Sequence, residues 1–196
     1  MIRGVFGPGT IVLGGGAVVL IGFLAIGLFL PGTWDATAEV HVHAPLDSVQ
    51  VLLDSPDGWR RWTPWPDSVA PGPGPRRGPG ASMTWSDSEL GSGTFRVEEV
   101  GGTASSDGPR TIAYTVEVEG VAGETLRTLG TVTLRAMGDS TRVVWREEGD
   151  LGNNPLMGFW ALSMERAQGT EMGKSLDRLA EVAGGGQITS SPGPTR

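Results

Sequence analysis

Residues 111–119 read TIAYTVEVE, and this stretch gives the clearest indication of the fold. Apolar and mostly polar residues alternate along it, as in a strand with one face in a core, and the inward set is Ile112, Tyr114, Val116 and Val118. Similar runs flank it at residues 81–85, 94–100, 125–137 and 141–149. Short turn signals such as Gly91-Ser92-Gly93 join these runs, which predicts an antiparallel meander.

Upstream, the sequence predicts one more strand, two short helices and a loop. Residues 34–44 alternate in the same way. Pro45 suits the first turn of a helix, and residues 57–66 hold three tryptophans in a second short helix followed by an irregular turn. Residues 71–80 read PGPGPRRGPG and contain too many breakers for a regular element. This exposed loop is interpreted as a floppy connector or, alternatively, as a gate over a cavity.

Downstream, the sequence predicts a long amphipathic helix from Pro155 to about Ala183. Its apolar residues recur near one stripe and include Met157, Trp160, Met164, Met172 and Leu179. Gly169-Thr170 leaves two consecutive helices as an alternative. A meander of this length must curl to bury one face, and this helix is the large apolar partner left for it. The expected fold class is therefore α+β, with a curved antiparallel sheet of six to seven strands wrapped on the C-terminal helix.

The N-terminal part is predicted to be a membrane anchor. Residues 10–30 contain no charge, and as a helix they would span roughly 31 Å, enough for the hydrocarbon core of a bilayer. A cleavable signal peptide is the alternative, because Ala36-Thr37-Ala38 has the A-x-A form, but the run exceeds the usual length of a signal h-region. Arg3 precedes the run, which favours a cytoplasmic N-terminus and an extracytoplasmic domain on a single-pass membrane protein.

The domain organisation that follows has four parts. Residues 1–9 form an N-terminal flank, residues 10–30 the anchor, and residues 31–183 one folded domain. The remaining residues, 184–196, are rich in Gly, Ser and Pro and are predicted to be a disordered tail.

Composition excludes several classes of function. The chain has 15 Lys and Arg against 22 Asp and Glu, a net charge of −7, so nothing draws it electrostatically to nucleic acid. It has no cysteine, which excludes disulfides and thiolate chemistry. His41 and His43 share one strand face, a spacing able to bind zinc or copper, but no third ligand is evident and no metal site is predicted. No phosphate loop or dinucleotide fingerprint is present, so no cofactor is expected.

The side chains aimed between the sheet and the terminal helix are mostly aromatics and methionines, which suit a lining for variable apolar guests. The candidate ligand-binding residues are Met83, Trp85, Phe95, Tyr114, Val116, Trp145, Met157, Trp160, Met164 and Met172. An ordinary filled core is the alternative. The Tyr114 hydroxyl is interpreted either as a polar anchor inside the cavity or as a group reaching the rim for water.

Five motifs occur in a fixed order: Trp59-Arg-Arg-Trp62-Thr-Pro-Trp65 after Ala44-Pro45, Gly78 to Trp85, Gly91-Ser-Gly93, Thr141 to Trp145, and Gly173 to Leu179. In this order they resemble the polyketide cyclase/dehydrase-like proteins of the SRPBCC (START-related) superfamily, over residues 34–183. The resemblance implies a helix-grip fold of seven antiparallel strands with an apolar cavity, the seventh strand falling near Asp67–Ala70. Members of that superfamily include lipid carriers, cyclases and interaction modules, and no shared catalytic residue carries over.

Three hypotheses of function follow. The first is a membrane-anchored domain that binds a small apolar or lipid-like molecule and catalyses no reaction on it. The second is a polyketide cyclase- or dehydrase-type enzyme, in which Tyr114 is the first polar group to test. The third is a protein-interaction module whose interior is filled by its own side chains.

Overall fold

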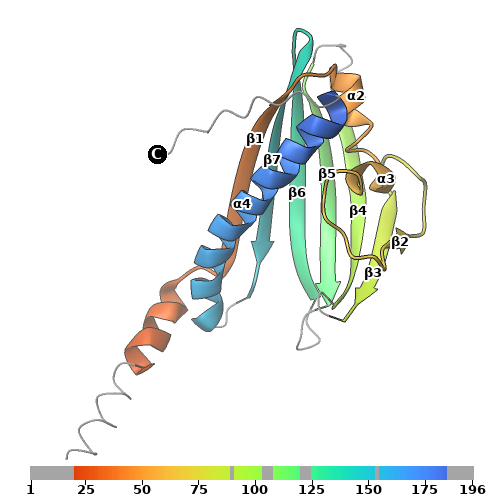
Figure 1. The fold of residues 1–196 in the computed structure, drawn as a ribbon. Helices are drawn as coiled ribbons and strands as arrows, with labels where there is room; N and C mark the ends of the chain where they lie inside the picture. Colours follow the sequence, from red (N-terminus) through yellow and green to blue (C-terminus); the bar gives the residue numbers. More distant parts are fainter. Residues whose placement is uncertain (1–19, 89–90, 103–107, 120–124, 153–154, 185–196) are drawn as a thin grey trace, which may run out of the picture.

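The described part of the computed structural model comprises residues 20–88, 91–102, 108–119, 125–152 and 155–184. Within it, seven strands form one antiparallel sheet in the order β1-β7-β6-β5-β4-β3-β2 (Figure 1). The strands are β1 (Thr33–Val42), β2 (Ala70–Pro71), β3 (Ser82–Asp87), β4 (Gly91–Gly102), β5 (Arg110–Glu119), β6 (Thr125–Met137) and β7 (Ser140–Asp150). The helices are α2 (Leu46–Gln50), α3 (Pro56–Trp59) and α4 (Pro155–Gly184), and residues 20–29 are also helical.

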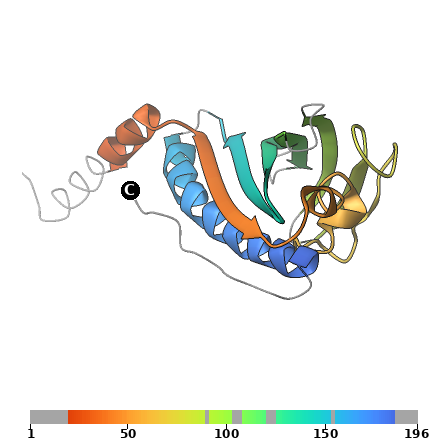
Figure 2. The ribbon, with the colours of Figure 1, turned by 90° about the horizontal axis from the view of Figure 1, so that it is seen from above.

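The predicted helix-grip architecture is confirmed. Strands β3 to β7 form the meander, and β1 pairs with the last strand so that Val40 lies opposite Val143. The sheet curves, and α4 runs along its concave side (Figure 2). Helix α4 is one continuous helix of 30 residues, so Gly169-Thr170 does not divide it. The seventh strand, β2, is only two residues long, and its bounds, Ala70–Pro71, overlap the expected Asp67–Ala70 only at Ala70.

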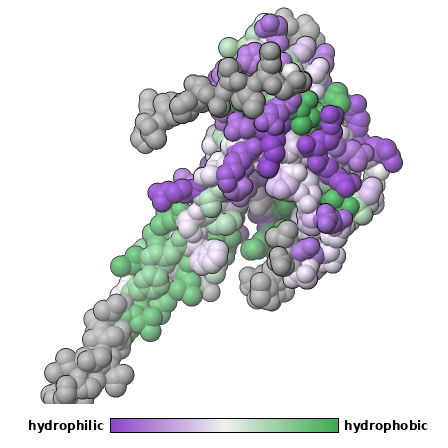
Figure 3. Space-filling view, in the orientation of Figure 1, coloured by the Kyte–Doolittle hydropathy of each residue, from purple (hydrophilic) through white to green (hydrophobic). Residues whose placement is uncertain are grey.

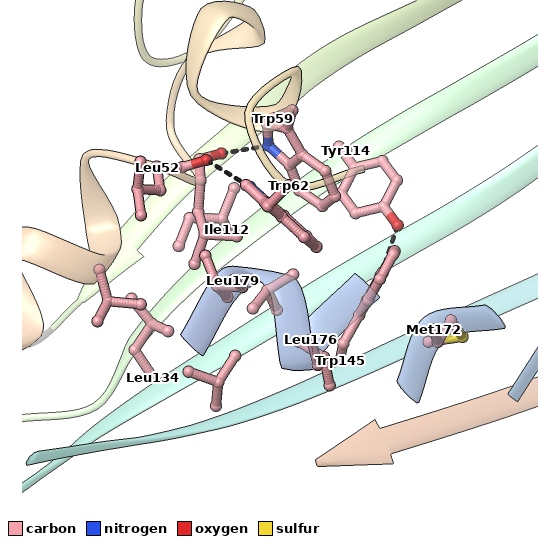
Figure 4. Close-up of a cluster of buried hydrophobic side chains, with 14 of the residues drawn as sticks. Leu52, Trp59, Trp62, Ile112, Tyr114, Leu134, Trp145, Met172, Leu176 and Leu179 are labelled. Atoms are coloured by element: carbon pink, nitrogen blue, oxygen red, sulfur yellow. Dashed lines mark hydrogen bonds between the residues drawn. The ribbon is translucent and has the colours of Figure 1, made fainter. Parts of the chain in front are cut away.

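The upper half of the space between sheet and α4 is filled by side chains. Trp59 and Trp62 are each 1% exposed, and their indole N–H groups donate to the carbonyls of Leu53 (2.6 Å) and Leu52 (3.1 Å) in the turn that follows α2. Leu134 from β6 and two α4 leucines complete this region (Figure 4). These two tryptophans therefore pack the short helix onto the sheet.

The expected hairpin turn at Gly91-Ser92-Gly93 is wrong, because these residues begin β4. Gly93 lies opposite Trp85, and a Cβ on it would come within 2.6 Å of the indole Cε2. The glycine is required by the ring that covers it, not by a turn. The same arrangement occurs twice more on the concave face, with Tyr114 over Gly130 and Trp34 over Gly149.

The Pro- and Gly-rich loop is fastened to the domain by specific bonds. The Arg77 guanidinium donates two hydrogen bonds to the mostly buried Asp54 carboxylate (2.8 and 3.2 Å). The amide of Gly78 donates to the Asp54 carbonyl, and that of Gly80 to the Val97 carbonyl, each at 2.7 Å. These contacts hold the loop against the domain, so the expected floppy connector is wrong, and the gate stays a prediction.

The predicted anchor is only partly within the described residues. Residues 20–29 form a helix beside the first turns of α4, and residues 10–19 lie outside the described part, as do the flank 1–9 and the tail from residue 185 (Figure 1). Among the residues that the structure describes, no helix is both long and apolar enough to cross a membrane.

Candidate functional site

A pocket of about 200 Å³ lies between the concave face of the sheet and the middle of α4. Strands β4, β5 and β7 supply one wall, α4 supplies another, and α3 with the segment after it closes the third. The lining residues are Trp59, Thr63, Pro64, Trp65, Phe95, Tyr114, Val116, Trp145, Glu147, Gln168, Glu171, Met172 and Ser175. The volume is below the roughly 300–1,000 Å³ of sites for drug-sized ligands, so the pocket suits a small molecule or one end of a longer one.

Five of the ten predicted residues line this pocket: Phe95, Tyr114, Val116, Trp145 and Met172. Met83 is buried but lines a separate hollow, of about 150 Å³, beneath the loop that follows β2. Trp85 is buried over Gly93 and contacts Trp65, with ring centroids 5.5 Å apart. Binding of a ligand by these residues stays a prediction.

Three of the predicted ligand-binding residues, Met157, Trp160 and Met164, lie in the N-terminal part of α4 and outside the pocket. Met157 and Met164 are half-buried, whereas Trp160 is 62% exposed. The buried stripe of α4 runs through Ala161, and neighbouring helix positions differ by about 100° in direction, so Trp160 points away from it. In addition, the first turns of α4 extend past the ends of β1 and β7, where no strand faces them (Figure 1).

A chain of hydrogen bonds crosses the pocket floor. The Trp145 indole N–H donates to the Tyr114 hydroxyl at 2.6 Å, and that hydroxyl donates to Glu147 Oε1. From the opposite wall, Gln168 Nε2 donates to Glu147 Oε2 at 2.5 Å. Glu147 is 5% exposed and Tyr114 is 2% exposed, so a carboxyl group lies buried beside the aromatic rings of this pocket. Of the two interpretations of the Tyr114 hydroxyl, the inward anchor fits this arrangement and the group reaching the rim does not.

Burial has a large effect on the two acids of this chain. It raises the pKa of the Glu147 carboxyl above its ordinary value, and the hydrogen bonds from Tyr114 and Gln168 act in the opposite direction. Burial is also the main cause that raises the pKa of the Tyr114 hydroxyl well above its ordinary value, and the nearby Glu147 charge adds to it. Tyr114 is therefore a neutral hydrogen-bond donor at physiological pH, and the Glu147 carboxyl is protonated more readily than that of an exposed glutamate.

Aromatic rings hold Tyr114 in place. Its ring centroid lies 4.8 Å from that of Trp59 and 5.1 Å from that of Phe95. Trp59 also packs edge-on against Trp145, with centroids 5.6 Å apart. Such pairs contribute about 0.5–1.5 kcal/mol each beyond the area they bury, so they stabilise this position of the Tyr114 ring.

Glu147 and Gln168 were not predicted from the sequence. The signal for Glu147 is present, because it follows Val143 and Trp145 at a spacing of two and so shares their inward face. Gln168 has a signal too, because it lies four residues after Met164 and four before Met172, on the stripe that the sequence predicts to face the sheet.

The two histidines are exposed on the outer side of β1 and just after it. His41 Nε2 lies 3.5 Å from the Glu39 carboxylate. Within the described ranges, no three His, Asp or Glu side chains group together in a way that could hold a metal ion.

Comparison with known proteins supports the same architecture. A hypothetical protein, jhp0584, from Helicobacter pylori superposes with a TM-score of 0.59 at 14% identity, over 76% of this chain and 87% of that one. A protein from Thermobifida fusca gives 0.52 at 18% identity, over 76% and 93%, and Ara h 8.0201 gives 0.50 at 16%, over 77% and 97%. At these identities the likeness shows the fold alone. No curated protein matches this chain.

The family described as "Polyketide cyclase / dehydrase and lipid transport" matches residues 33–184, which is the whole of the sheet and α4. The match begins at the first residue of β1 and ends at the last residue of α4. This chain therefore belongs to the polyketide cyclase/dehydrase and lipid transport family.

Proposed function

We propose that the chain is a membrane-anchored domain that binds a small apolar or lipid-like molecule in the pocket between the sheet and α4. The observation that carries the proposal is the lining of this pocket: aromatic rings, Val116 and Met172 surround a single buried carboxyl. A guest that suits it is apolar over most of its surface and carries one hydroxyl or carbonyl group to meet Glu147 or Gln168. Longer guests extend out along α4.

A fluorescent fatty-acid displacement assay tests this proposal. The full chain, in detergent, is titrated with a dansyl-labelled fatty acid and then with unlabelled apolar alcohols. Val116→Trp fills the pocket, whereas Val118→Trp adds the same bulk two residues further along the same face, outside the lining. We expect saturable binding to the wild type and to the Val118 variant, and a loss of about tenfold or more in affinity, roughly 1.4 kcal/mol, in the Val116 variant.

Equal binding by both variants would place the ligand elsewhere. Absence of saturable binding in all three proteins would refute the proposal and favour an interaction module instead. In that case the 200 Å³ space is a packing defect of an otherwise filled core.

Acid–base catalysis is a second candidate function, and one observation favours it. A carboxyl with a raised pKa lies beside a neutral phenol, and both face the pocket. A cyclase or dehydrase needs such a proton-exchanging group in a dry site. Once a ligand is found, conversion of that ligand by the wild type and not by Glu147→Gln, with binding retained, would establish catalysis. Binding without conversion would leave the carrier function.

The proposed membrane anchor, residues 10–30, is supported by the absence of charge throughout that segment. With Arg3 before it, the anchor would hold the folded domain outside the cytoplasm. Protease added to intact cells should then digest the domain while the full chain sediments with membranes. Digestion only after the cells are opened would reverse the orientation, and recovery of the full chain in the supernatant would refute the anchor.

A further inference from the structure

One end of the molecule presents an uncharged apolar surface built from two helices. We name it the apolar end and define it as residues 20–29 together with residues 155–162 of α4, which read LIGFLAIGLF and PLMGFWAL. Figure 3 shows green side chains covering helix 20–29 and the adjoining end of α4. Its exposed large apolar residues are Leu20, Ile21, Phe23, Ile26, Leu28, Phe29, Leu156, Trp160 and Leu162.

The two helices of the apolar end are packed together. The rings of Phe23 and Phe159 are stacked, with centroids 4.2 Å apart and planes 5° from parallel. Gly158 brings the backbones close, because a Cβ on it would come within 3.0 Å of Leu30. Any partner or solvent that surrounds helix 20–29 therefore also contacts the first two turns of α4.

The size of this surface requires an apolar neighbour. Phe29 is 89% exposed and Trp160 is 62% exposed, and seven further large apolar side chains are exposed around them. Soluble monomers rarely present a contiguous apolar patch of more than a few hundred Å² to water. The α4 part of this patch cannot serve the pocket, since the lining of the pocket begins further along α4, at Gln168.

Three observations identify the neighbour as a lipid bilayer. Helix 20–29 continues the uncharged run that starts at Thr10, so the apolar end is contiguous with the segment proposed to enter the membrane. Residues 155–162 carry no charge, and the first charges of α4, Glu165 and Arg166, follow within one turn, as at a boundary between lipid and water. Trp160 is the residue type that membrane–water interfaces favour.

A second copy of the chain fits this surface less well. No two glycines in residues 10–30 are four apart, so the close-packing motif of paired membrane helices is missing. The exposed side chains of the apolar end are long ones, Leu, Ile, Phe and Trp, which hold helix backbones apart.

We propose that the first two turns of α4 lie in the interface of the same bilayer that holds residues 10–30, and so tether the domain at two points. The proposal rests on the membrane anchor proposed above. Gly158 and Gln168 are ten residues apart, or roughly 15 Å along the helix, so the pocket lies close to the lipid surface. Bilayer lipids and the apolar molecules dissolved in them are then the source of the guest.

The absence of cysteine makes this proposal directly testable by site-specific labelling. Single cysteines are placed in the full chain by Leu156→Cys, Trp160→Cys, Phe29→Cys and Thr170→Cys, and each is labelled with nitrobenzoxadiazole. The last is the matched control, because Thr170 is exposed on α4 beyond the apolar end. Each protein is reconstituted into phosphatidylcholine vesicles with or without spin-labelled lipid, which quenches only probes in contact with the bilayer.

We expect a blue-shifted emission and loss of most of the fluorescence for labels at positions 156, 160 and 29, and neither change at 170. Quenching at 29 without quenching at 156 and 160 would overturn the second tether and keep the anchor. No quenching at any position would overturn the anchor itself. A blue shift at 156 and 160 that spin-labelled lipid does not quench would show a protein partner or a second copy, and would also overturn the proposal.

Discussion

The substitution Gly130→Ala adds one methyl group beneath the ring that orients the pocket carboxyl. A Cβ at position 130 would lie less than 3.0 Å from Cζ, Cε1 and Oη of Tyr114, closer than real Cβ contacts come. The backbone of β6 is hydrogen-bonded on both sides, to β5 and β7, so the ring has to move. Its hydroxyl then leaves Glu147 Oε1 and the Trp145 indole.

The expected loss of stability follows from three contributions. Overpacking a filled site costs about 1–3 kcal/mol. Loss of the hydroxyl partner of a buried carboxyl costs about 1–3 kcal/mol more. Replacing glycine restricts the unfolded chain and offsets about 0.4–1 kcal/mol of this. A net destabilisation of roughly 2–4 kcal/mol corresponds to a fall of roughly 5–15 °C in melting temperature for a domain of this size.

Thermal unfolding of the full chain in a mild detergent, followed by circular dichroism, measures this loss. Gly101→Ala is the matched control, because it is also a strand glycine and its nearest neighbour would be the flexible Glu99 carboxylate at 3.4 Å. In a Tyr114→Leu background, where the clashing atoms are gone, Gly130→Ala should cost almost nothing. An equal cost of Gly130→Ala in both backgrounds would refute the reasoning, as would a variant that melts with the wild type.

The remaining predictions concern buried polar groups. Because the pKa of the buried Glu147 carboxyl is raised in the folded state above its ordinary value of 4.5, the folded protein holds more protons than the unfolded chain between these two values. The melting temperature should therefore fall as pH rises from 4.5 through the folded pKa of Glu147. In Glu147→Gln, which cannot titrate, this fall should be absent. A fall of the same size in that variant would contradict the assignment to Glu147. Arg77→Met leaves the Asp54 carboxylate without its guanidinium and should lower the free energy of unfolding by about 1–3 kcal/mol. The control is Arg76→Met, at a side chain that is 90% exposed, and it should change the free energy of unfolding by less than about 0.5 kcal/mol. Equal changes in the thermal unfolding of the two variants would show that Arg77 does not fasten the loop. Thr141→Val removes a buried hydroxyl that donates to a backbone carbonyl at 2.8 Å and should cost about 1–2 kcal/mol in the same assay, whereas wild-type stability would show that this bond contributes nothing.

Local pattern was enough to predict the elements of the fold. Alternation along residues 111–119 and 141–149 predicts strands β5 and β7, and the apolar stripe after Pro155 predicts α4. Periodicities of two and 3.6 residues depend only on the backbone, so they survive whatever packs against them. The same alternation correctly predicted that the side chains of Phe95, Tyr114 and Trp145 point toward the interior.

Roles that depend on a partner distant in sequence could not be predicted in this way. Gly93 was expected in a turn, but it lies in strand β4, where the Trp85 ring leaves no room for a Cβ. Trp160 was expected in the pocket, but it is exposed because no strand reaches the first turns of α4. In both cases the deciding neighbour comes from another element.

By itself, the sequence determined the order and type of the elements, the family, and the uncharged N-terminal run. Tertiary structure alone decided that the interior is mostly filled, that about 200 Å³ is left beside α4, and that Glu147, Tyr114 and Gln168 meet there. The physical reason is that periodicity reports which face of an element is buried. The volume and the polar contacts of a pocket depend on how several faces fit together, and strand β5, strand β7 and helix α4 meet only in the folded chain.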